Sequence, residues 1–175
     1  MKKYPYLLFL LFFLSTHFLR AQVFSTIEKD NVTLDYPSNW VFRGKENPNN
    51  VVKESIFLEI AKDGDKDETR SVRVIRLNMS GKNVSLRDMQ LYFEKIYQNT
   101  KGASQILKRN TGKVNGYKYN TVTIMSSLED FNLIAVQRIF QKDETYYFIS
   151  VASPLAVFAD FKTTGIQILD SFEVK

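Results

Sequence analysis

The spacing of apolar residues along the chain predicts many short strands and two helices. Apolar and polar residues alternate within the predicted strands, and clusters of Gly, Asn, Asp and Pro separate the strands from one another. The expected strands cover residues 23–27, 32–36, 55–61, 71–78, 105–110, 117–125, 131–141 and 145–152, with a last short one within 171–174. The pair Asn115-Gly116 is typical of a tight hairpin turn.

The first helix is expected to begin after Ser85. This residue is a good N-cap, and Asp88 three residues later makes an acidic variant of the capping box. Helical spacing places five residues on the buried face: Leu86, Met89, Phe93, Ile96 and Tyr97. The opposite side carries Arg87, Gln90, Glu94 and Gln98. Gly102 is a natural stop, so the helix should end near Lys101.

The second helix is expected to begin at Ser153-Pro154, a capping residue followed by proline at the first helical position. Its buried face would carry Leu155, Phe158, Phe161 and Ile168. The connections between the strands are too short for parallel crossovers, and strand 145–152 is apolar on both faces. The pattern therefore predicts an α+β fold, in which a twisted antiparallel β-sheet is flanked by helices on both faces.

The stretch VTLDYPSNW, residues 32–40, resembles the opening of the PsbP-like family. A strand ends there in Tyr-Pro, and the only Trp, Trp40, follows three residues later. The central GYKYNTV and the C-terminal TYYFISVASPLAVFADFKTTGIQILDSFEV are also similar to this family, which includes photosystem II PsbP, a Ran-GTPase-binding protein and exported bacterial domains. The resemblance implies a core position for Trp40 and a domain that binds other macromolecules without catalysis. It carries over no binding site.

Residues 1–22 have the pattern of a secretory signal peptide. Two lysines precede the apolar run from Leu7 to Leu14, which is too short to span a bilayer, and we expect cleavage near Ala21-Gln22. Residues 23–175 would then form one exported domain without a transmembrane segment, in the periplasm or outside the cell. That domain carries 21 basic and 19 acidic residues, a net charge of +2 that is weak evidence for nucleic-acid binding.

Residues 23–175 contain neither histidine nor cysteine, because His17 lies in the predicted signal peptide and the chain has no Cys. This excludes Ser-His and Cys-His nucleophile pairs, zinc sites built from those residues, and disulfides. We therefore expect no cofactor, no metal site and no enzymatic activity, although catalysis by carboxylates alone stays open. The run Asp63–Asp67 spaces its carboxylates like the start of a calcium loop, but it lacks the later Gly and Glu of an EF-hand.

Two groups of residues are candidates for a binding surface. The basic residues Lys108, Arg109, Lys113 and Lys118 straddle a predicted hairpin, where they would either protect an exposed sheet edge or bind an acidic partner. Tyr117, Tyr119 and Tyr146 would form an aromatic surface or lie half-buried beneath a helix. The leading hypothesis is an exported binding module that assembles or stabilises a protein partner of the cell envelope. The alternative is a carrier that holds a small apolar or lipid-like ligand between a helix and the sheet.

Overall fold

The computed structural model describes residues 22–43, 56–64, 70–99, 104–127, 130 and 132–175. The described strands are β1 (Phe24–Lys29), β2 (Val32–Pro37), β3 (Trp40–Arg43), β4 (Ile56–Lys62), β5 (Ser71–Asn78), β6 (Ser104–Val114), β7 (Tyr117–Ser127), β8 (Asn132–Lys142), β9 (Thr145–Pro154) and β10 (Glu173–Val174). The described helices are α2 (Leu86–Asn99) and α3 (Phe158–Ser171), and a short 3₁₀ turn (Leu155–Val157) precedes α3. Residues 1–21 of the predicted signal peptide and residues 65–67 of the calcium-like run lie outside the described residues.

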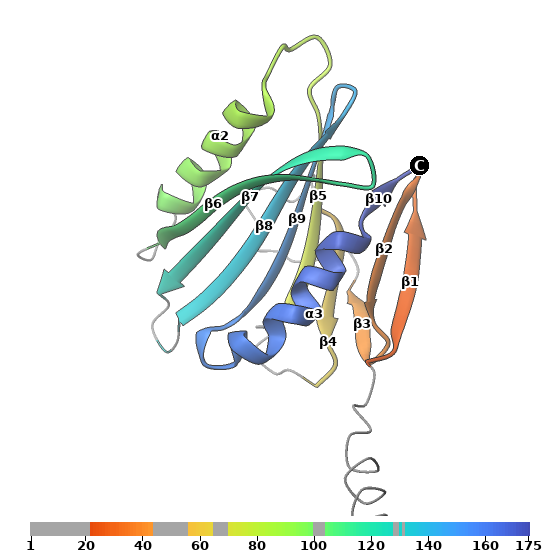
Figure 1. Cartoon of the computed structure of the whole chain (residues 1–175), viewed down its shortest axis with the longest axis vertical. Coiled ribbons are helices and arrows are strands. Elements are labelled where there is room, and N and C mark those ends of the chain that lie inside the picture. The colour runs from red at the N-terminus through yellow and green to blue at the C-terminus, as the bar shows by residue number, and fades with distance from the viewer. Residues whose placement is uncertain (1–21, 44–55, 65–69, 100–103, 128–129, 131) are drawn as a thin grey trace, which may run out of the picture.

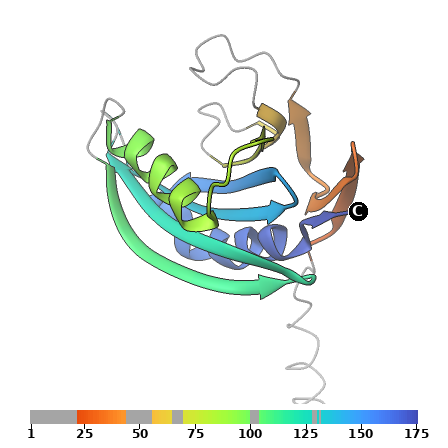
Figure 2. The same ribbon diagram turned by 90° about the horizontal axis from the view of Figure 1, so that it is seen from above.

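The strands form two antiparallel sheets (Figure 1). Seven strands make the larger sheet in the order β3-β4-β5-β9-β8-β7-β6, and β1-β2-β10 make the smaller one. Helices α2 and α3 pack on opposite faces of the larger sheet, and α3 also contacts β2 of the smaller one. Figure 2 shows the larger sheet curving around α3. The predicted α+β fold is therefore confirmed, with the C-terminal strand added to a second sheet.

The main core lies between α3 and the two sheets. Phe161, Ile168 and Leu169 of α3 pack there with the apolar residues of β4, β5 and β9 that face the helix. Trp40 is 6% exposed, and its ring stacks on the ring of Phe161 with centroids 5.7 Å apart. The predicted core position of Trp40 is thus confirmed. A smaller core beneath α2 contains Met89, Phe93, Ile139, Tyr146 and Phe148.

Two local predictions were wrong. The residue pair Ser153-Pro154 does not cap a helix, because β9 continues through Pro154 and Ser153 is fully buried. The helix α3 begins at Phe158 instead, so Leu155 lies in the 3₁₀ turn, where it is 44% exposed. The short strand β3 was missing from the prediction. None of the described helices combines the length and apolar character needed to cross a membrane.

Candidate interaction surface on the β6–β7 hairpin

The strands β6 and β7 form a hairpin at one end of the larger sheet. β6 is the last strand in the sheet order, and β7 is its partner strand. Asn115 and Gly116 make the turn with φ angles of 49° and 85°, which these two residue types tolerate best. A β-bulge shifts the register between Ile106 and Lys108. The hairpin therefore presents a strand edge of eleven residues at the border of the sheet.

The hairpin is strongly basic. Residues 104–127 contain no Asp or Glu, so Lys108, Arg109, Lys113 and Lys118 give this segment a net charge of +4. All four side chains are exposed. Lys113 and Lys118 are paired across the two strands, which keeps two like charges side by side. None of the three lysines forms an ion pair with a described residue.

Arg109 differs from the lysines because it binds helix α2. Its Nη2 and Nε donate to the two carboxylate oxygens of Glu94 at 2.7 and 2.9 Å, and Gln90 Nε2 donates to the same carboxylate at 2.7 Å. Glu94 is 4% exposed and Gln90 is 7% exposed, so their predicted position on the solvent side of the helix was wrong. Hydrogen bonding to Arg109 lowers the pKa of the Glu94 carboxyl, which keeps this buried group ionised.

The ion pair stands at one end of a polar row that crosses the sheet beneath α2. The strand register aligns one residue from each strand: Arg43, Glu59, Arg73, Ser150, Gln137, Val122 and Arg109. Arg73 Nε donates to Glu59 Oε1 at 2.7 Å. Burial raises the pKa of the Tyr97 hydroxyl, while the Arg73 charge and a hydrogen bond with Ser150 lower it. Arg73 and Arg109 of this row therefore each bind a buried carboxylate.

This row offers no obvious pair of reacting groups. Glu59 and Glu94 are the two buried carboxylates of the described chain, and each is bound to its own arginine. Over the same residues, no three Asp, Glu, His or Cys side chains are close enough together to hold a metal ion. The arrangement attaches α2 to the sheet, and it leaves the three lysines of the hairpin without an ion-pair partner among the described residues.

The three candidate tyrosines do not form one surface. Tyr146 is 1% exposed beneath α2, and its hydroxyl donates to the carbonyl of Val84, so it belongs to no exposed patch. Tyr117 and Tyr119 lie half-buried on the α3 side of the sheet. The hydroxyl of Tyr117 donates to the Val174 carbonyl at 2.8 Å, and the Tyr119 ring lies 4.5 Å from the Arg138 guanidinium. Tyr117 thus connects the hairpin to β10, and Tyr119 contacts β8.

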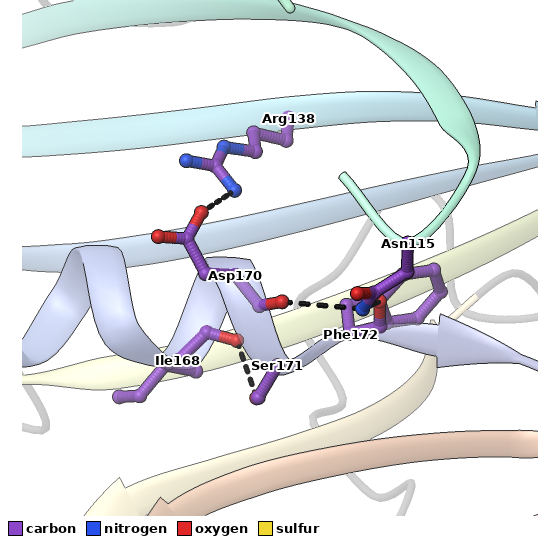
Figure 3. A network of polar contacts seen from close by, with 6 residues as sticks. All are labelled: Asn115, Arg138, Ile168, Asp170, Ser171 and Phe172. Atoms are coloured by element: carbon purple, nitrogen blue, oxygen red, sulfur yellow. Dashed lines mark hydrogen bonds and ion pairs between the residues drawn. The ribbon is translucent and has the colours of Figure 1, made fainter. Parts of the chain in front are cut away.

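The tip of the hairpin is held against the end of α3 (Figure 3). Asn115 Nδ2 donates to the carbonyls of Asp170 and Phe172, at 3.4 and 3.2 Å. On the neighbouring strand β8, the buried guanidinium of Arg138 donates to the Asp170 carboxylate. Neither hydrogen bond could be predicted from local sequence. Asn115 is 55 positions from Asp170, and Arg138 is 32 positions from it. The basic hairpin is consequently held at two points, by α2 at Arg109 in the middle of β6 and by the end of α3 at Asn115 in the turn.

Comparisons with known proteins identify the fold through structure alone. No family model matches the sequence, and no curated protein sequence does. The structure is similar to that of PsbP from Synechocystis (CyanoP), with a TM-score of 0.68, 11% identity, and coverage of 90% of this chain and 96% of that one. It is also similar to LpqN, involved in cell envelope biogenesis of Mycobacterium tuberculosis, with a TM-score of 0.59, 8% identity, and coverage of 89% and 92%.

A third similar structure is a protein of unknown function from Pseudomonas aeruginosa, a putative regulator. The TM-score is 0.55 at 10% identity, over 87% of this chain and 97% of that one. Identities this low establish a common fold and carry no residue roles from one protein to another. The agreement extends over most of each chain, as the stretch VTLDYPSNW and the C-terminal pattern predicted. The chain therefore has the fold of the PsbP-like family.

Proposed function

We propose that this protein is an exported, non-catalytic binding module that holds an acidic protein partner of the cell envelope through its β6–β7 hairpin. The observation that carries the proposal is the charge of the hairpin: +4 with no acidic residue, at the edge of a domain whose remaining charges nearly cancel. Three exposed lysines there make no ion pair with a described residue. Unpaired charge of one sign attracts a partner of the opposite sign and speeds its association.

Export is part of the same proposal. Residues 1–22 would be the signal peptide, and 23–175 the exported domain. The similarity to LpqN, whose role is in cell envelope biogenesis, supports a place in the envelope. The absence of His and Cys from residues 23–175 supports a role in binding over catalysis.

The carrier alternative has less support. A ligand between α3 and the sheet would need space that side chains occupy: the rings of Trp40 and Phe161 stack, and a Cβ added at Gly165 would lie 3.2 Å from Val151 Cγ2. On the other face, the rings of Phe93 and Phe148 have centroids 3.7 Å apart. Contacts this close at these points argue against an apolar binding cavity there.

The test is co-purification of the affinity-tagged full chain from its own cells, with mild cross-linking and mass spectrometry. The charge-reversal variant changes Lys108, Lys113 and Lys118 to Glu. Arg109 stays unchanged, because its reversal would break the ion pair with buried Glu94. Lys162→Glu, which reverses an exposed lysine of α3, is the control for charge reversal elsewhere on the surface.

We expect one envelope protein to be enriched by the wild type and by the Lys162 variant, and to be lost with the triple variant. If the triple variant enriches the same envelope protein as the wild type does, the proposed surface is overturned. A co-purifying lipid or small molecule without a protein would favour the carrier.

A further inference from the structure

We propose that β6 binds its partner by strand addition: an extended acidic segment of the partner pairs with the free edge of β6 and becomes the eighth strand of the larger sheet. This inference rests on the proposed function and adds a binding mode to it. It follows from three observations: the backbone groups that β6 presents outward, the placement of its lysines, and two exposed leucines beside the edge.

The hairpin geometry identifies the outward backbone groups. In a two-residue hairpin, the residues that flank the turn form a hydrogen-bonded pair, and bonded and non-bonded pairs then alternate along the strands. Val114 and Tyr117 flank the turn. The next pairs run Lys113 with Lys118, Gly112 with Tyr119, and Thr111 with Asn120. Thr111, Lys113 and, by the same alternation, Arg109 therefore direct their N–H and C=O groups away from β7.

These outward groups have no partner in the described chain. No backbone hydrogen bond joins β6 to a described element other than β7, and no described strand lies beyond it. Edge strands in soluble proteins are usually blunted by proline, by a covering loop or by charge. β6 has a bulge near its start and basic side chains, but it contains no proline. From Lys108 to Val114 the edge is regular and long enough to pair with another strand.

The lysines on this edge favour an acidic partner segment over a basic one. Lys108 and Lys113 would repel another basic strand, including a second β6 hairpin, and would attract carboxylates on an acidic one. Lys118 stands opposite Lys113, so the positive charge extends across the hairpin. The same lysines thus discourage pairing with a second copy and admit an acidic segment.

Two exposed leucines give the partner apolar contacts. Leu107 lies at the bulge two residues before Arg109, and Leu91 lies one helical turn before Glu94. They are 46% and 47% exposed. The Arg109–Glu94 ion pair joins the two segments, which places both leucines near the same end of the edge. The occupant is therefore an extended peptide segment that combines acidic and apolar residues.

The test uses a dye-labelled peptide of about ten residues that alternates glutamate with valine, and a matched peptide with lysine in place of glutamate. We expect the full chain to bind the acidic peptide at least about tenfold more tightly than the basic one. Thr111→Pro removes one outward N–H on an edge strand that tolerates proline, and should weaken binding about fivefold or more. Thr111→Ala keeps that N–H and should bind within about twofold of wild type.

A second measurement uses the wild-type chain alone. It therefore tests strand addition even if the Thr111→Pro variant does not fold. On addition of the acidic peptide, hydrogen exchange should slow at the amides of Arg109, Thr111 and Lys113. The amides of Asn110 and Gly112, which already bond to β7, should not change. Unchanged exchange at all five amides, or equal binding of both peptides, would overturn the strand-addition mode.

The two proposals fail differently. If the partner protein is lost on lysine reversal but retained by Thr111→Pro, the basic surface stands and strand addition falls. If the lysine reversal leaves peptide binding intact and makes the protein self-associate in sedimentation, the lysines serve only as edge protection. That outcome overturns the role of the lysines in both proposals, as the basic surface that holds the partner and as the charges that select an acidic strand.

Discussion

Helices α2 and α3 cover opposite faces of one sheet, yet they are attached to it by different means. α3 packs into a core shared by both sheets, and Gly165 allows its backbone to approach Val151 closely. α2 rests on a smaller apolar cluster and depends on the Glu94–Arg109 ion pair at the sheet edge. Local stability follows the amount of buried apolar contact. We infer that α3 opens only with the whole domain, whereas α2 opens by itself at lower cost, beside the surface proposed to bind a partner.

The largest expected effect is on the α3 side. Phe172 directly follows α3, is 1% exposed, and contacts the rings of Phe140 and Tyr147 with centroid distances of 5.1 and 5.7 Å. Phe172→Ala should lower the free energy of unfolding by about 3–5 kcal/mol, measured by urea titration. Leu91→Ala on the exposed side of α2 is the control and should change it by less than about 0.5 kcal/mol. Equal effects of the two substitutions would contradict the place of Phe172 in the main core.

A smaller loss is expected in the hairpin, where the Tyr119 ring packs against Arg138 of β8. A Cβ at Gly112 would lie 2.4 Å from Tyr119 Cζ, so Gly112→Ala must displace the ring. The displacement would separate Tyr119 from the Arg138 guanidinium, at a cost of about 2 kcal/mol. Thr111→Ala on the neighbouring position is the control. A thermal melt of the Gly112 variant that coincides with the wild type would show that the ring has room to move.

On the α2 side the expected effect depends on pH. Glu94→Gln should lower the free energy of unfolding by about 1 kcal/mol at neutral pH, a low value because solvent screens the exposed Arg109. The folded pKa of Glu94 lies below the usual glutamate value of 4.5, mainly because Arg109 hydrogen-bonds its carboxylate. The stabilisation is therefore present above pH 4.5 and is lost as the pH falls through the folded value.

The measurement is urea unfolding of the wild type and the Glu94 variant from neutral pH down to about pH 3. The two stabilities should differ at neutral pH and converge in acid. A constant difference over the whole range would mean that the amide loses packing and that the ion pair contributes nothing measurable.

The same contrast explains how far the sequence could predict the molecule. The first helix was predicted well because its start is a local feature, Ser85 with Asp88, and Ser85 Oγ donates to that carboxylate at 2.6 Å. The burial of Glu94 was missed because its partner Arg109 stands on a separate strand. Strand β3 was missed because it has only four residues, and it is defined by its pairing with β4 and not by a local pattern. Local signals predicted elements, whereas long-range partners decided which polar side chains are buried.

The candidate surface was predicted in part for the same reason. Lys108, Lys113 and Lys118 were recognised as a basic group because a hairpin brings them together over a short stretch of sequence. The position of β6 at the end of the sheet depends on the full strand order, which no local pattern contains. The sequence left Tyr146 either on an aromatic surface or beneath a helix, and the packing of α2, which is distant in sequence, places it beneath the helix.

The smallest expected effect is a change in hydrogen exchange, and it tests directly whether α2 opens independently of α3. Ser85 caps α2: the Asp88 N–H donates to Ser85 Oγ at 3.1 Å, and the Ser85 N–H donates back to the Asp88 carboxylate at 3.3 Å. Ser85→Ala removes the first of these bonds and should speed hydrogen exchange in α2 about threefold. In α3 the rates should not change, because its amides exchange only when the whole domain unfolds. If instead α2 and α3 accelerate together, the helices open as one unit. The hairpin would then be no more dynamic near Arg109 than near Asn115, and the ion pair would have to be regarded as part of a single core.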